Sequence, residues 1–285
     1  MKFDLRQEWT PEFTERSPVF TPLQSWAEKF NHFNDRWPGL SDYQHVLDSL
    51  AHPILTLAGK KLKIVQQDGK PGHFNEHYAP RIYYTGEIQT RTENWHDFFQ
   101  FLTWFMFPKT KAVINSIHVP AAQERIENKQ DSGRRSAVEN MLSLFDEGGA
   151  VLLATDESLL QLVKDFHWKE LFWHRRSELE SKFKLITFGH ALYEKALSPY
   201  VGMTANCIIL QVDEDFMTRS NDFQLGWVDE QLAQLFLQGT RYIKPKDLTP
   251  FPLLGLPGWD SDNESESYYD NTHYFRAGRG LKSRS

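Results

Sequence analysis

The sequence of 285 residues contains a single cysteine, Cys207. One cysteine excludes an intrachain disulfide and a zinc cluster built on cysteines, and it is typical of a reducing compartment. No apolar run reaches the ~20 residues that a bilayer requires. The charged start, MKFDLRQEW, also lacks the apolar stretch of a signal peptide. We therefore expect a cytoplasmic protein with no membrane partner.

Several motifs of common enzyme classes are missing as well. The sequence contains no G-x-G-x-x-G, no Walker loop and no G-x-S-x-G, so dinucleotide, nucleotide and serine-hydrolase functions lack support. Lys and Arg number 32 against 38 Asp and Glu, which gives a net charge of −6. A protein that binds a phosphate backbone needs a basic surface, so the charge disfavours a nucleic-acid partner.

The residues that are present predict a mostly helical α+β protein. Hydrophobic residues make up 40% and aromatic residues 14% of the chain, enough for a large core built on rings. Strand-like segments are few and do not alternate regularly with helices, so we expect an α+β arrangement with a small sheet. The sequence shows no clean domain boundary, so we expect one globular domain, 1–285. A flexible connection is expected at 124–135 and a frayed basic tail at 277–285. The expected strands are 61–66, 81–90, 150–155 and 205–212.

The segment TENWHDFFQFLTWFMFPKTK predicts a buried helix with polar residues at its start. Asn94 is the expected N-cap, with Asp97 at the third helical position. Aromatic residues cover most of the circumference, whereas His96, Gln100 and Thr103 share one stripe. That stripe either lines a cleft or belongs to an internal network of satisfied polar groups.

A second histidine lies in FGHALYEKAL, which we expect within one long helix over 177–197. The helical spacing places His190 on the apolar face, with Glu194 one turn further on. A carboxylate beside an imidazole raises its pKa and fixes its orientation, as in acid–base catalysis or metal binding. The alternative is a core histidine satisfied by its neighbour.

Charged residues near these helices are further candidates. Arg91 and Lys111 flank the aromatic helix and could hold a phosphate or carboxylate. Asp146 and Glu147 end a helix before a glycine pair, where their charge opposes the helix dipole. Either an arginine of GRRS offsets these acids, or they bind a divalent metal, or they are simply exposed.

The C-terminal segment is rich in aromatic residues, and we expect it to fold back over the body. Closing a cleft is one role open to it there. Trp259 and Arg276 in this segment are candidate substrate-binding residues. Its D-x-D-N run lacks the glycine and glutamate of a calcium loop. HFNEH, at 73–77, matches an inverted zinc-peptidase motif by chance, because the neighbouring prolines prevent the required helix.

The ordered motifs TGEIQTRTENWHDFFQFLTWFMFPKTKAVIN, LFDEGGAVLL, FGHALYEKAL and LLGLPGW resemble a bacterial family, domain of unknown function 3025. The resemblance covers most of the chain after about residue 75 and implies no established activity. Trp95 and Gln100 depart from the family pattern. The positions that match it are Arg91, Asn94, His96, Asp97, Pro108, Lys111, Asn115, Asp146, Glu147, His190, Trp259, Asn263 and Arg276.

Three functions follow as hypotheses. A non-catalytic protein that binds a small anionic ligand or a protein partner is favoured. The alternative is a hydrolase, with or without a divalent metal, that acts on an anionic substrate. A third hypothesis is a ββα-type nuclease, although neither expected strand carries the histidine that this motif needs. The hydrolase would use His96, Asp97, His190 and Glu194 for catalysis and Arg91, Asn94, Lys111, Trp259 and Arg276 for substrate binding.

Overall fold

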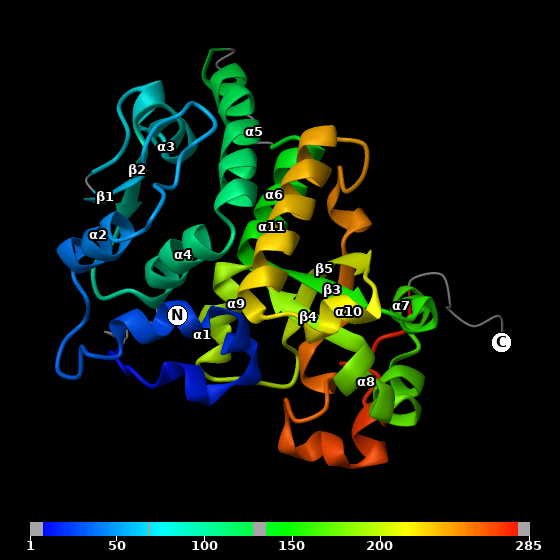
Figure 1. Ribbon diagram of the computed structural model, residues 1–285. Coiled ribbons are helices and arrows are strands. Elements are labelled where there is room, and N and C mark those ends of the chain that lie inside the picture. The colour runs from blue at the N-terminus through cyan, green and yellow to red at the C-terminus, as the bar shows by residue number, and fades with distance from the viewer. Residues whose placement is uncertain (1–7, 68, 128–134, 279–285) are drawn as a thin grey trace.

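A mixed four-stranded sheet organises much of the computed structural model, which describes residues 8–67, 69–127 and 135–278 (Figure 1). Strand β3 runs antiparallel to β4 and parallel to β5, and β5 runs antiparallel to β6. Every residue of β3 is buried, as expected for a strand covered on both faces. The predicted mostly helical α+β class is confirmed. The strands of this sheet are β3 (Gly149–Ala154), β4 (Phe183–Thr187), β5 (Thr204–Gln211) and β6 (Thr249–Pro252).

Helices surround this sheet. Asp156 caps the helix after β3 by accepting a hydrogen bond from the Ser158 amide at 2.8 Å, as its sequence position predicts. The surrounding helices are α6 (Ala137–Gly148), α7 (Glu157–Lys164), α8 (Arg176–Lys182), α9 (His190–Ala196), α10 (Glu214–Thr218) and α11 (Asn221–Gln238).

The prediction of one long helix over 177–197 is wrong. The segment divides into α8, strand β4 and α9. The run FKLITFG consists largely of aromatic and β-branched residues, which favour a strand once a neighbouring strand is available. Spacing alone could not distinguish the two structures, because a short apolar run satisfies both periods. As a consequence, His190 begins a helix instead of lying in the middle of one.

A second, smaller sheet pairs β1 (Lys63–Gln66) with β2 (Glu87–Thr90) in parallel. Helix α3 (Tyr78–Thr85) connects them, so the segment 81–90 is only partly the strand that we predicted. Parallel strands separated by a helix differ from a ββα hairpin, which removes the structural basis for the nuclease hypothesis. Helix α2 (Leu40–Asp48) packs against β1, and α3 packs against α5.

The aromatic helix α4 (Trp95–Met106) is buried along most of its surface. Asn94 caps it, accepting from the Asp97 amide at 3.0 Å, as predicted. Helix α5 (Pro108–Glu127) follows at once and rises beside α6 and α11 (Figure 1). It extends into the segment 124–135, which was predicted as a flexible connection. Residues 128–134 of that segment lie outside the described residues.

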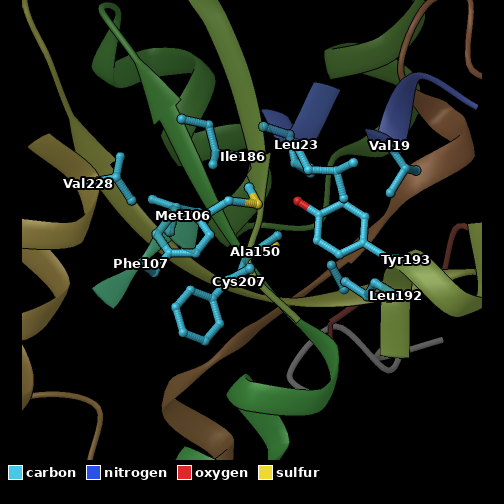
Figure 2. Packing of buried hydrophobic residues seen from close by; sticks show 14 of the residues in the cluster. Val19, Leu23, Met106, Phe107, Ala150, Ile186, Leu192, Tyr193, Cys207 and Val228 are labelled. Carbon is cyan, nitrogen blue, oxygen red and sulfur yellow. The ribbon is translucent and has the colours of Figure 1, made fainter. Parts of the chain in front are cut away.

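The core joins elements from the whole chain. Figure 2 shows Val19 and Leu23 of the N-terminal segment converging with Tyr193 of α9 and Cys207 of β5.

Among the described residues, no helix combines the length and the apolar character needed to cross a bilayer. Helix α1 (Gln24–Ala27) and one π-helical turn, Glu170–His174, complete the helices, with 3₁₀ turns at Phe13–Arg16, Pro18–Leu23, Glu28–Phe30, Phe74–Glu76, Pro245–Asp247, Leu253–Gly255, Ser261–Glu264 and Glu266–Asp270.

The C-terminal segment folds back over the body, as predicted, and buries Tyr269, Tyr274 and Phe275. Asn263 is fully buried and donates to the carbonyl oxygens of Leu254 and Leu256 at 2.9 and 2.7 Å. Its Oδ1 atom, the one that a calcium ion would need, accepts a hydrogen bond from Arg176 Nη2 at 3.3 Å. The side chain therefore stabilises the segment instead of serving as a calcium ligand. Most of the predicted frayed tail, 279–285, lies outside the described residues.

Candidate functional site

The imidazoles of His96 and His190 are in direct contact. Their Nε2 atoms lie 3.2 Å apart, and their ring centroids are 4.5 Å apart with the planes nearly perpendicular. His96 lies in the first turn of α4, and His190 is the first residue of α9. The packing of α4 against α9 brings together two histidines that are far apart in the sequence.

Glu194 orients the His96 ring. Its Oε2 atom lies 3.0 Å from His96 Nδ1, and this hydrogen bond raises the pKa of His96. The sequence predicted that Glu194 would lie beside His190 on the same helix, whereas in the structure it pairs with His96 of α4. With Nδ1 bound to a carboxylate, His96 Nε2 faces His190.

His190 is buried, with only 2% of its surface exposed. Burial lowers its pKa to about 4, so this imidazole is neutral at neutral pH. Its Nδ1 atom has no hydrogen-bond partner among the described residues and lies 3.8 Å from Asp146 Oδ2. Its Nε2 atom lies 3.6 Å from Oε2 of Glu147, whose side chain is about half exposed.

Asp146 and Glu147, which the sequence treated as one acidic pair, have different environments. Lys111 binds Asp146, with Nζ 2.6 Å from Oδ1, and the lysine is almost fully buried. Burial acts to raise the pKa of Asp146, but Lys111 and His190 outweigh it and hold the pKa below its ordinary value. Among the described residues, the charge that offsets Asp146 is thus Lys111. Of the two GRRS arginines, Arg135 donates to Ser143 Oγ at 2.9 Å and Arg134 lies outside the described residues. Glu147, in contrast, faces the imidazoles.

His96, His190, Asp146, Glu147 and Glu194 form a histidine–carboxylate cluster. Two glycines set its spacing. The amides of Phe188 and Gly189 donate to the Gly149 carbonyl oxygen at 3.0 and 2.8 Å. A Cβ atom on Gly189 would collide with the backbone at Glu147 and Gly149. The missing side chain therefore lets the start of α9 approach the end of α6, which places His190 beside Glu147.

The cluster opens into a cavity of about 1110 Å³ between the smaller sheet, α3 and helices α4, α5 and α6. Lys111, Asn115 and His118 line it from one face of α5, at spacings of four and three residues. Asn115 Oδ1 is buried and has no hydrogen-bond partner among the described residues. Sequence reasoning missed His118, although its helical spacing from Lys111 could have revealed it.

Arg91 and Asp97 form a second feature of the cavity wall. Arg91 donates to the buried Asp97 carboxylate through its backbone amide, Nε and Nη2 at 2.7, 3.0 and 2.7 Å. This hydrogen bonding raises the pKa of Arg91. Asp97, predicted as catalytic, thus holds a guanidinium at the cavity. Tyr78 and Arg81 also line the cavity, and sequence reasoning missed both.

Three predicted substrate-binding residues lie elsewhere. Asn94 is occupied as the N-cap of α4. Trp259 lines a separate groove of about 780 Å³ together with Trp173. Arg276 is exposed, and its Nε donates to the His273 carbonyl oxygen at 2.8 Å.

Of the HFNEH histidines, His77 lines the cavity beside a single 3₁₀ turn, as expected for a motif without a helix.

Fold and site together define a mostly helical α+β protein with a histidine–carboxylate cluster in a polar cavity. The chain belongs to the family described as "Protein of unknown function (DUF3025)", whose model matches residues 62–279. The matched region contains every residue of the cluster. Searches of curated proteins and of solved structures found no protein that matches the chain.

Proposed function

We propose that the protein is a hydrolase that acts on a small anionic substrate in the cavity beside His96 and His190. The observation that carries this proposal is the pair of imidazoles, 3.2 Å apart, at the wall of a cavity of about 1110 Å³. Side chains converging on one polar cavity from separate elements are typical of active sites.

The cluster has the groups that hydrolysis requires. A water molecule in the cavity beside His96 and His190 would lose a proton to the cluster as its oxygen attacks a carbonyl or phosphoryl centre. The cluster then returns a proton to the leaving group as its bond to that centre breaks. Glu194 fixes the orientation of His96 throughout, which keeps the reacting geometry constant.

Two arginines in the cavity lining favour an anionic substrate. Arg81 and Arg91 line the cavity, and each is held by a carboxylate, Glu87 at 2.6 Å and Asp97 at 2.7 Å. These bonds use only part of each guanidinium's five N–H donors. Planar N–H groups in fixed positions suit carboxylate and phosphate oxygens.

A second candidate is the binding or regulatory protein that the sequence favoured. Its support is that Asp97 and Asp146 are each neutralised by a cation, Arg91 and Lys111. Such pairing resembles a satisfied internal network more than a reactive site. A cytoplasmic location and a small anionic ligand belong to both candidates as predictions from the sequence.

Turnover separates the two candidates. The full chain, assayed with and without divalent metals, would be screened against phosphate monoesters and diesters and against esters and amides of dicarboxylic acids. We expect hydrolysis of at least one class, lowered about 100-fold or more in His96→Asn. His73→Asn, an exposed histidine outside the cavity lining, is the matched control and should retain full activity. Saturable anion binding with no turnover of any class would support the binding protein instead.

A further inference from the structure

We propose that His96, His190 and Glu147 bind one divalent transition-metal ion, with Zn²⁺ as the best match. One ligand atom from each residue lies within 4.8 Å of the others. The site draws on three helices, α4, α6 and α9. The proposal concerns metal binding and rests on the proposed function only for the role of the ion.

The spacing of the ligand atoms fits a tetrahedral ion. Zn–N bonds of about 2.0–2.1 Å at tetrahedral angles place two nitrogen ligands about 3.3 Å apart. The Nε2 atoms of His96 and His190 are 3.2 Å apart, and Glu147 Oε2 is 3.6 Å from His190 Nε2. A small rotation of the half-exposed Glu147 side chain would complete three positions of the tetrahedron.

A carboxylate lies behind each imidazole, but only the one behind His96 is within hydrogen-bond distance. His96 Nδ1 is hydrogen-bonded to Glu194 at 3.0 Å, and His190 Nδ1 faces Asp146 at 3.8 Å. When each Nδ1 carries the ring proton, each Nε2 presents a lone pair to the same point. Carboxylates behind metal-binding histidines are a regular feature of such sites, because they fix the tautomer and the ring orientation.

The ligand set and its charge select the kind of ion. Two imidazole nitrogens and one carboxylate favour first-row transition metals, whereas Mg²⁺ and Ca²⁺ prefer oxygen ligands. Glu147, Glu194 and Asp146 surround the imidazoles, and Lys111 offsets one of these charges. All three ligands line the cavity, so a water molecule from the cavity could take a fourth position, as in zinc hydrolases, where three protein ligands leave one place for water.

Metal binding is measured directly on the untagged full chain after treatment with a chelator. Isothermal titration with Zn²⁺ is expected to give one tight site, and Co²⁺ is expected to give the visible absorption of a tetrahedral complex. Glu147→Gln and His96→Asn should weaken Zn²⁺ binding about 100-fold or more. Glu194→Gln, which changes only the orienting contact, should weaken it about 10–100-fold.

The exposed His73 provides the matched control, since His73→Asn should bind Zn²⁺ as the parent does. Glu147 is about half exposed, so its substitution tests the site without disturbing the core. Substoichiometric binding in the parent, or equal affinity in parent, Glu147→Gln and His96→Asn, overturns the proposal. Loss of binding only in His73→Asn also overturns it, because the ion would then lie on HFNEH.

The metal site and the hydrolase can fail separately. Stoichiometric Zn²⁺ binding without turnover of any substrate class leaves the metal site and removes the proposed function. Turnover by the metal-free protein that depends on His96 has the opposite meaning: the hydrolase stands, and the imidazoles act without a bound ion.

Discussion

His96 Nε2 and His190 Nε2 lie 3.2 Å apart although 94 positions separate the two residues in the sequence. Glu194, one helical turn after His190, binds the opposite nitrogen of His96. Helix α9 therefore contributes both an imidazole and the carboxylate that orients the other imidazole. The positions of both imidazole rings therefore depend on the packing of α4 against α9.

This contact has an electrostatic consequence. Two neutral imidazoles with protons on Nδ1 would direct two lone pairs at each other across 3.2 Å, which is repulsive. Either a proton on one Nε2 or a cation between the two atoms removes the repulsion. This geometry thus accommodates two states: a hydrogen bond between the two Nε2 atoms, or a metal ion bound by both. Titration with Zn²⁺ distinguishes them.

The Asp97–Arg91 pair should contribute measurably to stability. Asp97 is 6% exposed and accepts three hydrogen bonds from Arg91. Asp97→Asn removes the charge and some of the acceptor capacity, so we expect the free energy of unfolding to fall by about 1–3 kcal/mol. Urea denaturation measures this change. Asp48→Asn, in an exposed pair with Lys61, should alter it by less than about 0.5 kcal/mol. Equal losses in the two variants would contradict the assignment.

Asn263 should be essential for docking the C-terminal segment. Its Nδ2 atom donates to two buried carbonyl oxygens, and Asp at this position would place a carboxylate against them. Arg176 Nη2 already donates to Oδ1 at 3.3 Å and would pair with one carboxylate oxygen. We therefore expect Asn263→Asp to lower the free energy of unfolding by about 1–3 kcal/mol, through the loss of the two buried donors. In the same segment, the exposed Asn271 accepts a hydrogen bond through Oδ1 from the His273 amide at 3.2 Å. Asn271→Asp keeps that acceptor and should be nearly neutral in denaturant titrations. Similar behaviour of the two variants would show that the buried donors of Asn263 are unimportant.

Glu178 predicts a specific pH dependence. Hydrogen bonds from Arg175 and Lys182 lower its pKa from 4.5 to about 2. A carboxyl whose pKa is lower in the folded state stabilises the fold above pH 4.5, and this contribution disappears as the pH falls from 4.5 to 2. The difference in Tm between the parent and Glu178→Gln should therefore be present at pH 7 and shrink through that interval. Because the side chains of Arg175, Glu178 and Lys182 are partly exposed, 1 M NaCl should also reduce it. A difference that does not change with pH would contradict the prediction.

The sequence identified much of the site because local signals carried it. Capping chemistry predicted Asn94 and Asp97 correctly at the start of α4. The aromatic circumference of the same helix marked His96 as one of few polar side chains on a buried element. These features depend on neighbours in the sequence, so they are readable from it.

The pairings in the site were not readable, because tertiary contacts determine them. Nothing local indicates that Glu194 binds His96 instead of His190, or that Lys111 neutralises Asp146. The wrong helix over 177–197 hid the fact that His190 begins α9. Glu147 became distinguishable from Asp146 only when the structure showed which of the two faces the imidazoles.

Gly189 offers a test of the spacing between His190 and Glu147 that leaves both residues unchanged. A methyl group at this position collides with the backbone of Glu147 and Gly149. Gly189→Ala must therefore push the start of α9 away from the end of α6, and overpacking of this kind costs about 1–3 kcal/mol of stability. We also expect Zn²⁺ affinity to fall at least about 10-fold, since the two ligands move apart.

Gly226, in α11, is the matched control, because a Cβ atom there meets no described atom within 4 Å. Gly226→Ala should leave Zn²⁺ affinity unchanged and raise the free energy of unfolding by about 0.5–1 kcal/mol, as alanine favours a helix over glycine. Comparing the two variants by titration and denaturation separates a change in ligand spacing from a general effect of alanine. If Gly189→Ala loses stability but binds Zn²⁺ as tightly as the parent, the approach of α9 to α6 serves the fold alone, and the ion does not bridge His190 and Glu147.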